Sequence, residues 1–265
     1  MLFWLAACSS PEPRWASVRV SCGMADGETA DDPRVDPDDA GLLRYDAACA
    51  RALGDDLGVR WDAFPNADLP GTLDGEPVER LIAGAWLLQA GNFGTVGEWL
   101  DDPVVPDTFV EELERLAATL GHGRDAPASA LLYDYAANVV AAVAPGESNH
   151  ATMDVLTDTL EVGNLGSVDP LYMLGLLLHE AAHHSGRYHR ACTSAAGTPL
   201  DAADDDWDGA YGVNGALLLV YAEHASTKGA IEGGIDQVHA VMDGLCAEAS
   251  LPDALVERLA YLEAE

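Results

Sequence analysis

The chain has 265 residues, 49% of them hydrophobic, which is enough to bury a core as one large domain or two small ones. It carries 45 acidic residues against 13 basic ones, for a formal net charge of −32. Such a charge repels the phosphates of nucleic acids and the anionic face of a membrane, so no nucleic-acid partner is expected.

The first residues resemble the lipobox of bacterial lipoproteins. Leu5, Ala6 and Ala7 precede Cys8, and in that class of protein the cysteine is lipidated after cleavage. The resemblance implies a cell-envelope or secreted protein, with membrane contact only through a lipid on Cys8. No apolar run reaches the roughly 18 residues that a transmembrane helix needs.

Without Cys8, an even number of cysteines remains, which in an exported chain predicts two disulfides. Four cysteines allow three pairings, and the simplest joins Cys22 to Cys49 and Cys192 to Cys246. A four-cysteine zinc site is the alternative, but the chain has no C-x-x-C pair to nucleate one.

Residues 23–39 are mainly Asp, Glu, Pro and Gly, the composition of a solvated linker that does not form a packed core. We therefore expect residues 1–39 to form an export segment followed by an acidic linker. Residues 40–265 are expected to form a single domain.

Beyond the linker, apolar residues recur at helical spacing between segments rich in Gly, Pro and Asp, which predicts a mainly α fold, with α+β as the alternative. The expected helices cover residues 40–53, 78–90, 108–120, 127–144, 213–227, 231–245 and 252–262. Residues 152–162 contain β-branched residues and are followed by Gly163 and Asn164, which predicts a strand and a small sheet. Residues 199–209 are expected to be a polar loop.

A further helix is predicted between Asp169 and Gly186. Asp169 is a good N-cap, Pro170 suits the first turn, and Gly186 is a natural terminator. The apolar run that ends at Leu178 indicates that this helix is buried.

This helix carries His179-Glu180-Ala181-Ala182-His183, the H-E-x-x-H pattern. Histidines at i and i+4 project from one helical face, so two imidazoles can share one metal ion. The carboxylate of Glu180 can reach a water on that metal and act as its general base. Zinc would lower the pKa of the water towards about 7 and polarise a carbonyl group.

The whole run from His179 to His189 matches H-E-x-x-H-x-x-G-x-x-H, with Gly186 in register. It is similar to the zinc signature of the metzincin metallopeptidases, and so implies a zincin-like domain that hydrolyses peptides or proteins. By the same resemblance Gly186 turns the chain and His189 is the third zinc ligand. The family also has a methionine turn beneath the metal, but Met242, the only downstream methionine, lies in a segment expected to be helical.

Glu223 is a rival third ligand, because it lies in an apolar helical segment where a carboxylate seldom lacks a partner. A glutamate from a second helix completes the zinc site of the gluzincin metallopeptidases, and Glu223 would have that role by resemblance. Its alternative is a solvated position on an amphipathic helix. His184 and His224 are expected outside the ligand set, supporting the site or lying at the surface.

Two other patterns suggest further sites. Asp204, Asp206 and Asp208 match the start of a calcium loop, although Gly215 stands where a bidentate glutamate is expected. The alternative is a solvated acidic loop. Cys22 followed by Gly23 resembles the cysteine switch of matrix metallopeptidases, in which a thiolate blocks the zinc, but a disulfide uses Cys22 more simply.

The leading hypothesis is therefore a zinc-dependent hydrolase, specifically a metallopeptidase. The alternative is a zinc-binding envelope protein without turnover. Glu180 discriminates between them, because a binding site does not require an unligated carboxylate beside the metal. In a third hypothesis the chain is an interaction protein whose motif helix only fills the core.

Overall fold

The computed structural model describes residues 13–24, 46–67, 76–147, 151–163, 170–225 and 228–264. In these ranges the protein is mainly helical with two small sheets, which confirms the predicted fold class. Cys8 and the lipobox, most of the predicted linker, and Asp169 lie outside the described residues.

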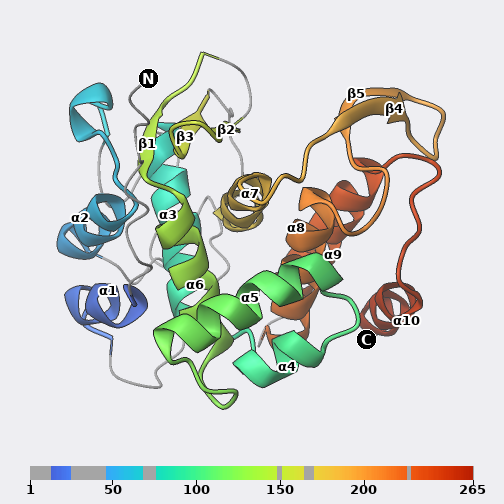
Figure 1. Cartoon of the computed structure of the whole chain (residues 1–265), viewed down its shortest axis with the longest axis horizontal. Coiled ribbons are helices and arrows are strands. Elements are labelled where there is room, and N and C mark those ends of the chain that lie inside the picture. Colours follow the sequence, from blue (N-terminus) through green and yellow to red (C-terminus); the bar gives the residue numbers. More distant parts are fainter. Residues whose placement is uncertain are drawn as a thin grey trace, which may run out of the picture.

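Figure 1 shows how the elements are arranged in space, with colours that follow the sequence. The strands are β1 (Ala142–Pro145), β2 (Ala151–Asp154), β3 (Thr159–Val162), β4 (Arg190–Thr193) and β5 (Pro199–Ala203). The helices are α1 (Trp15–Ser21), α2 (Ala47–Asp56), the 3-10 helix η2 (Trp61–Ala63), α3 (Pro77–Ala90), α4 (Val96–Asp101), α5 (Asp107–Leu120), α6 (Ala128–Val139), α7 (Pro170–His183), α8 (Ala210–His224), α9 (Lys228–Asp243) and α10 (Asp253–Glu263).

Helix α7 lies at the centre of the molecule, between α3 and α6 on one side and α8 and α9 on the other (Figure 1). Helices α7 and α3 cross so closely that a Cβ atom on Gly84 of α3 would lie only 2.7 Å from the backbone nitrogen of Leu174 in α7. Leu174, Leu177 and Leu178 are fully buried at this crossing and in the surrounding core. A helix that is apolar on all sides is stable only when it is buried on all sides, as α7 is.

The larger sheet has the strand order β1-β3-β2, with β1 parallel and β2 antiparallel to β3. Strand β2 is the edge that contacts α7. The single strand expected over residues 152–162 is wrong, because two strands and a turn occupy the segment. The Asp154 carboxylate accepts hydrogen bonds from the Leu156 backbone and the Thr157 hydroxyl, and Asp158 has a φ of 50°, so the chain reverses there.

Two other expected boundaries are wrong. The helix expected over residues 127–144 ends at Val139, because Val140 is extended and Ala142–Pro145 forms a strand paired with β3. The polar loop expected over residues 199–209 begins with β5, which pairs with β4. Pairing with another strand decides both segments, and the spacing of apolar residues along the chain does not report such pairing.

Helices α1 and α4 were not expected. The N-terminus of α4 has a capping box formed by Thr95 and Glu98, a local signal that the sequence does contain. Helix α1 falls within the segment assigned to the N-terminal extension, yet it packs against α2 and α6. The buried Asp134 carboxylate of α6 accepts hydrogen bonds from the backbone nitrogens of Arg14 and Trp15, at 2.8 and 2.7 Å.

Both predicted disulfides are present, joining Cys22 to Cys49 and Cys192 to Cys246. The protein is therefore suited to an oxidising, extracellular environment. Because the Cys22 sulfur is bonded to Cys49, it is not a free thiolate, and the cysteine-switch prediction is wrong. No helix among the described residues combines the length and apolar character needed to cross a membrane.

Replacing Cys192 and Cys246 together by serine should lower the free energy of unfolding by about 2–4 kcal/mol, because the unfolded chain gains conformational freedom. Cys192–Cys246 spans 54 residues and Cys22–Cys49 spans 27. Because the shorter loop restricts the unfolded chain less, Cys22–Cys49 should contribute slightly less to the free energy of unfolding. Denaturant unfolding of the two double variants measures the difference. Free thiols at all four positions of the exported protein, found by non-reducing mass spectrometry, would contradict the pairing.

Candidate metal centre

Helix α7 presents His179 and His183 on one face, one turn apart. Both side chains are buried, and their ring centroids lie 5.0 Å apart. Burial lowers the pKa of His179 well below its usual value, and the neighbouring His183 and His189 lower it further. Burial also lowers the pKa of His183. Both imidazoles are therefore neutral near pH 7 and can offer a lone pair.

The chain turns back sharply after α7 and brings a third histidine to the same point. Gly186 has a φ of 84°, a left-handed conformation that glycine adopts without strain. His189 then places its Nε2 atom 3.0 Å from the Nε2 atom of His179, and its ring centroid 4.6 Å from that of His183. Each of the three histidines offers a ligand atom, and these atoms lie within 4.8 Å of one another. The predicted turn and the predicted convergence of His189 are both present.

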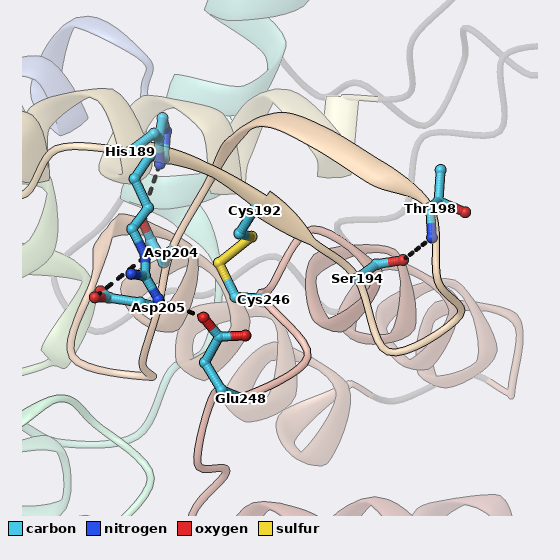
Figure 2. Close-up of a disulfide and its surroundings, with 9 residues drawn as sticks. His189, Cys192, Ser194, Thr198, Asp204, Asp205, Cys246 and Glu248 are labelled. Atoms are coloured by element: carbon cyan, nitrogen blue, oxygen red, sulfur yellow. Dashed lines mark hydrogen bonds and ion pairs between the residues drawn. A yellow bond between two sulfur atoms is a disulfide. The ribbon is translucent and has the colours of Figure 1, made fainter.

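Two of the three imidazoles are oriented by hydrogen bonds from their other nitrogen. The Nδ1–H of His183 donates to the backbone carbonyl of Arg187. The Nδ1–H of His189 donates to the Asp204 carboxylate at 2.8 Å (Figure 2). Because a carbonyl or carboxylate oxygen only accepts, these bonds fix the proton on Nδ1. The Nε2 lone pairs are left for a metal, which is how metal-binding histidines are usually oriented.

The arrangement suits a divalent metal ion that prefers nitrogen ligands. In a regular tetrahedron with metal–nitrogen bonds of about 2.0 Å, two ligand nitrogens lie about 3.3 Å apart. The 3.0 Å between the Nε2 atoms of His179 and His189 is close to that distance. Three histidine ligands also leave one tetrahedral position open for water or a substrate atom. The histidine group can therefore hold a metal ion.

Glu180 lies beside these histidines. Its side chain is 4% exposed, and its carboxylate accepts a hydrogen bond from the backbone N–H of Met153 in β2. Burial raises the pKa of Glu180 to about 8, an effect that the Met153 hydrogen bond partly opposes. A cation bound nearby would also lower the pKa of Glu180, because it favours the charged carboxylate.

A cavity of about 600 Å³ opens beside the histidines and Glu180. This volume is within the range of small-molecule and peptide side-chain sites. Burial raises the pKa of Tyr211 to about 12, so its hydroxyl stays protonated and able to donate a hydrogen bond. The remaining lining residues are mainly apolar and come mostly from β2, α7, α8 and α9, and include Met153, Tyr172, Leu176, Asn214, Leu218 and Val241.

The three aspartates of the predicted calcium loop have separate contacts. Asp204 is buried and binds His189 with one oxygen and the Tyr211 backbone N–H with the other, at 2.8 and 2.7 Å. Asp206 accepts a hydrogen bond from the Asp208 backbone. Asp208 accepts from the backbone and hydroxyl of Thr108, at the N-terminus of α5. Among the described residues, the group of three side chains placed to hold a metal ion is that of the histidines, and calcium binding by these aspartates stays a prediction.

Glu223 is not a third ligand. It lies near the C-terminus of α8 and forms an ion pair with Arg258 of α10, which also binds Asp102. The partner expected for a carboxylate in an apolar helix is therefore an arginine, and the gluzincin-like alternative is wrong. His184 pairs with Asp158 at the surface, and His224 is exposed, as expected for residues outside the ligand set.

Met242 lies within α9, so the described residues after α7 contain no methionine turn. Three residues of the site carry no signal in the sequence that would assign them to it: Asp204, the partner of His189, together with Arg187 and Tyr211. Arg187 occupies a variable position of the motif, Tyr211 belongs to no motif, and Asp204 fits the start of a calcium loop. The contacts of Asp204 and Tyr211 with the histidines depend on how separate segments of the chain pack.

Comparison with protein-family models, curated proteins and solved structures finds no match to this chain. The site is therefore defined by the geometry of its own residues.

Replacing His189 by alanine should weaken zinc binding by more than about 100-fold, because a contact of the third ligand is lost, whereas loss of an outer partner costs about 10- to 100-fold. Glu223→Ala is the matched control and should bind zinc like the parent protein. Competition with a coloured chelator measures both affinities. Zinc loss in Glu223→Ala with normal affinity in His189→Ala would refute the ligand set.

Proposed function

We propose that the protein is a zinc-dependent hydrolase, specifically a metallopeptidase. One observation carries the proposal: Glu180 faces the same cavity as the three converging imidazoles but is not one of them. A site that only stores or senses metal does not require a buried carboxylate beside the ligands. A hydrolase requires such a carboxylate as its general base.

When bound, zinc would act as a Lewis acid and lower the pKa of a water molecule. His179, His183 and His189 would hold it through their Nε2 atoms, with His183 and His189 kept in orientation by Arg187 and Asp204. Glu180 would accept the proton of the attacking water and pass it to the departing amine.

Tyr211 would assist as a hydrogen-bond donor. Its ring packs edge-on against His179, with centroids 4.6 Å apart, and its hydroxyl is kept protonated by burial. A protonated hydroxyl near the metal can stabilise the negative charge that develops on a substrate carbonyl oxygen.

The position of β2 favours a peptide over other substrates of hydrolases. This strand is the edge of its sheet, and Ala151, Thr152 and Met153 line the cavity. The Met153 N–H of this strand donates to Glu180, and the remaining backbone groups of the edge can pair with an extended peptide whose side chain enters the cavity. Its apolar lining suits an uncharged side chain.

The resemblance of residues 179–189 to the metzincin signature supports the same activity. We place the protein in the cell envelope through a lipid on Cys8, or outside the cell, in agreement with its two disulfides. Its partners would be a peptide or protein substrate and, through the lipid on Cys8, a membrane.

Glu180→Gln should keep its zinc and lose hydrolysis by about 10²- to 10⁴-fold, because the amide has nearly the same shape but cannot accept the proton. Glu223→Gln, which removes a carboxylate from the Arg258 ion pair, is the control and should remain active. Zinc content by elemental analysis and cleavage of a mixed peptide library by mass spectrometry give the two readouts.

If the parent protein binds zinc but cleaves nothing, the non-catalytic zinc-binding alternative replaces the hydrolase. Full activity in Glu180→Gln would instead overturn the role of Glu180 and leave the metal site standing.

A further inference from the structure

Arg187 lies between the second and third histidines in the chain, and its side chain is buried. Its guanidinium group contacts acceptors on three separate parts of the fold. On α5, it forms an ion pair with Glu112 at 3.0 Å and donates to the Thr108 hydroxyl at 2.5 Å. It also donates to the carbonyls of Asp208, before α8, and Ala182, in the last turn of α7, at 3.2 and 3.5 Å.

The acceptors are themselves held in place. The second carboxylate oxygen of Glu112 accepts a hydrogen bond from the Tyr135 hydroxyl of α6 at 3.0 Å. The Thr108 hydroxyl donates to Asp208 at 3.0 Å. The guanidinium group is thus fixed against α5, α6, α7 and the segment before α8, and the side chain of Arg187 has little freedom to move.

The backbone of the same residue belongs to the metal centre. The carbonyl of Arg187 accepts the Nδ1–H of His183, and only Tyr188 separates Arg187 from His189. Gly186, the residue before Arg187, has a positive φ, a backbone conformation that residues with a side chain rarely adopt. The Asp204 carboxylate holds the imidazole of His189, whereas the side chain of Arg187 holds the backbone of the turn itself against α5 and the segment before α8.

We propose that Arg187 is the positioning residue of the metal centre: its ion pair with Glu112 holds the turn that orients His183 and delivers His189. This inference rests on the proposed metal site. The stability of the fold is a poor explanation for the contact, because a buried ion pair costs nearly as much in desolvation as it returns. Its effect is geometric, since the pair fixes where the carbonyl of Arg187 lies.

Lysine does not replace arginine in this role. The guanidinium group has five N–H donors in a rigid plane, and its contacts with Glu112, Thr108, Asp208 and Ala182 use that spread. A lysine ammonium is a single flexible point charge with three donors. Arg187→Lys therefore keeps the charge beside Glu112 and loses the hold on the turn.

The test compares Arg187→Lys with Arg258→Lys. Arg258 is a matched control, because it also pairs with two carboxylates from different elements, Asp102 and Glu223, but it does not contact the histidine turn. Zinc affinity is measured by chelator competition, the cobalt-loaded protein is examined by visible absorption, and thermal unfolding is followed on the metal-free proteins. Glu112→Gln tests the same contact from its other side.

Arg187→Lys and Glu112→Gln should each weaken zinc binding by about 10- to 100-fold and alter the cobalt spectrum, which reports ligand geometry. Arg258→Lys should retain the parent affinity and spectrum even if it unfolds at a lower temperature. A parent-like affinity and spectrum in Arg187→Lys would overturn the proposal, as would equal losses in Arg187→Lys and Arg258→Lys. If Arg187→Lys does not fold, Glu112→Gln decides by the same criteria. A parent protein that binds neither metal would instead refute the metal site itself.

Discussion

The candidate metal centre depends on the burial of α7. A helix rich in leucine is held by α3 and α6 on one side and α8 and α9 on the other, so its last two turns cannot shift or fray into solvent. Burial also removes water from His179 and His183 and keeps both imidazoles neutral. The close crossing at Gly84 ties the position of the two ligands to the main core of the protein. The positions of His179 and His183 are therefore set by the packing of the core.

Local signals predicted the part of this arrangement that one segment of chain decides. The spacing of His179, Glu180 and His183, the turn at Gly186 and most helices follow from neighbouring residues, and the structure agrees with them. Parts that depend on distant segments were missed. Strand β1 was assigned to a helix because its partner β3 is a separate segment, and Asp204 was assigned to calcium because its contact with His189 crosses a loop. In a run of acidic residues, the sequence alone does not indicate which side chain each carboxylate will bind.

In a chain with a strong excess of acidic residues, three of the arginines connect separate segments of the fold. Arg14, Arg187 and Arg258 each join segments that are far apart in the sequence, and each contacts more than one of them. Most of the acidic surplus can remain in solvent, where repulsion is weakened by salt. A guanidinium group with several donors suits such bridging better than an ammonium group, in agreement with the presence of only one lysine, Lys228, in the whole chain.

Asp204 serves the metal centre and the scaffold with the same carboxylate. One oxygen binds His189, and the other binds the backbone at the N-terminus of α8, where Gly209 leaves room for it. Ligand orientation and helix initiation are therefore thermodynamically linked: whatever holds His189 in place also favours the first turn of α8. An ion bound by His189 would therefore stabilise the first turn of α8, and removal of the ion would weaken the start of that helix.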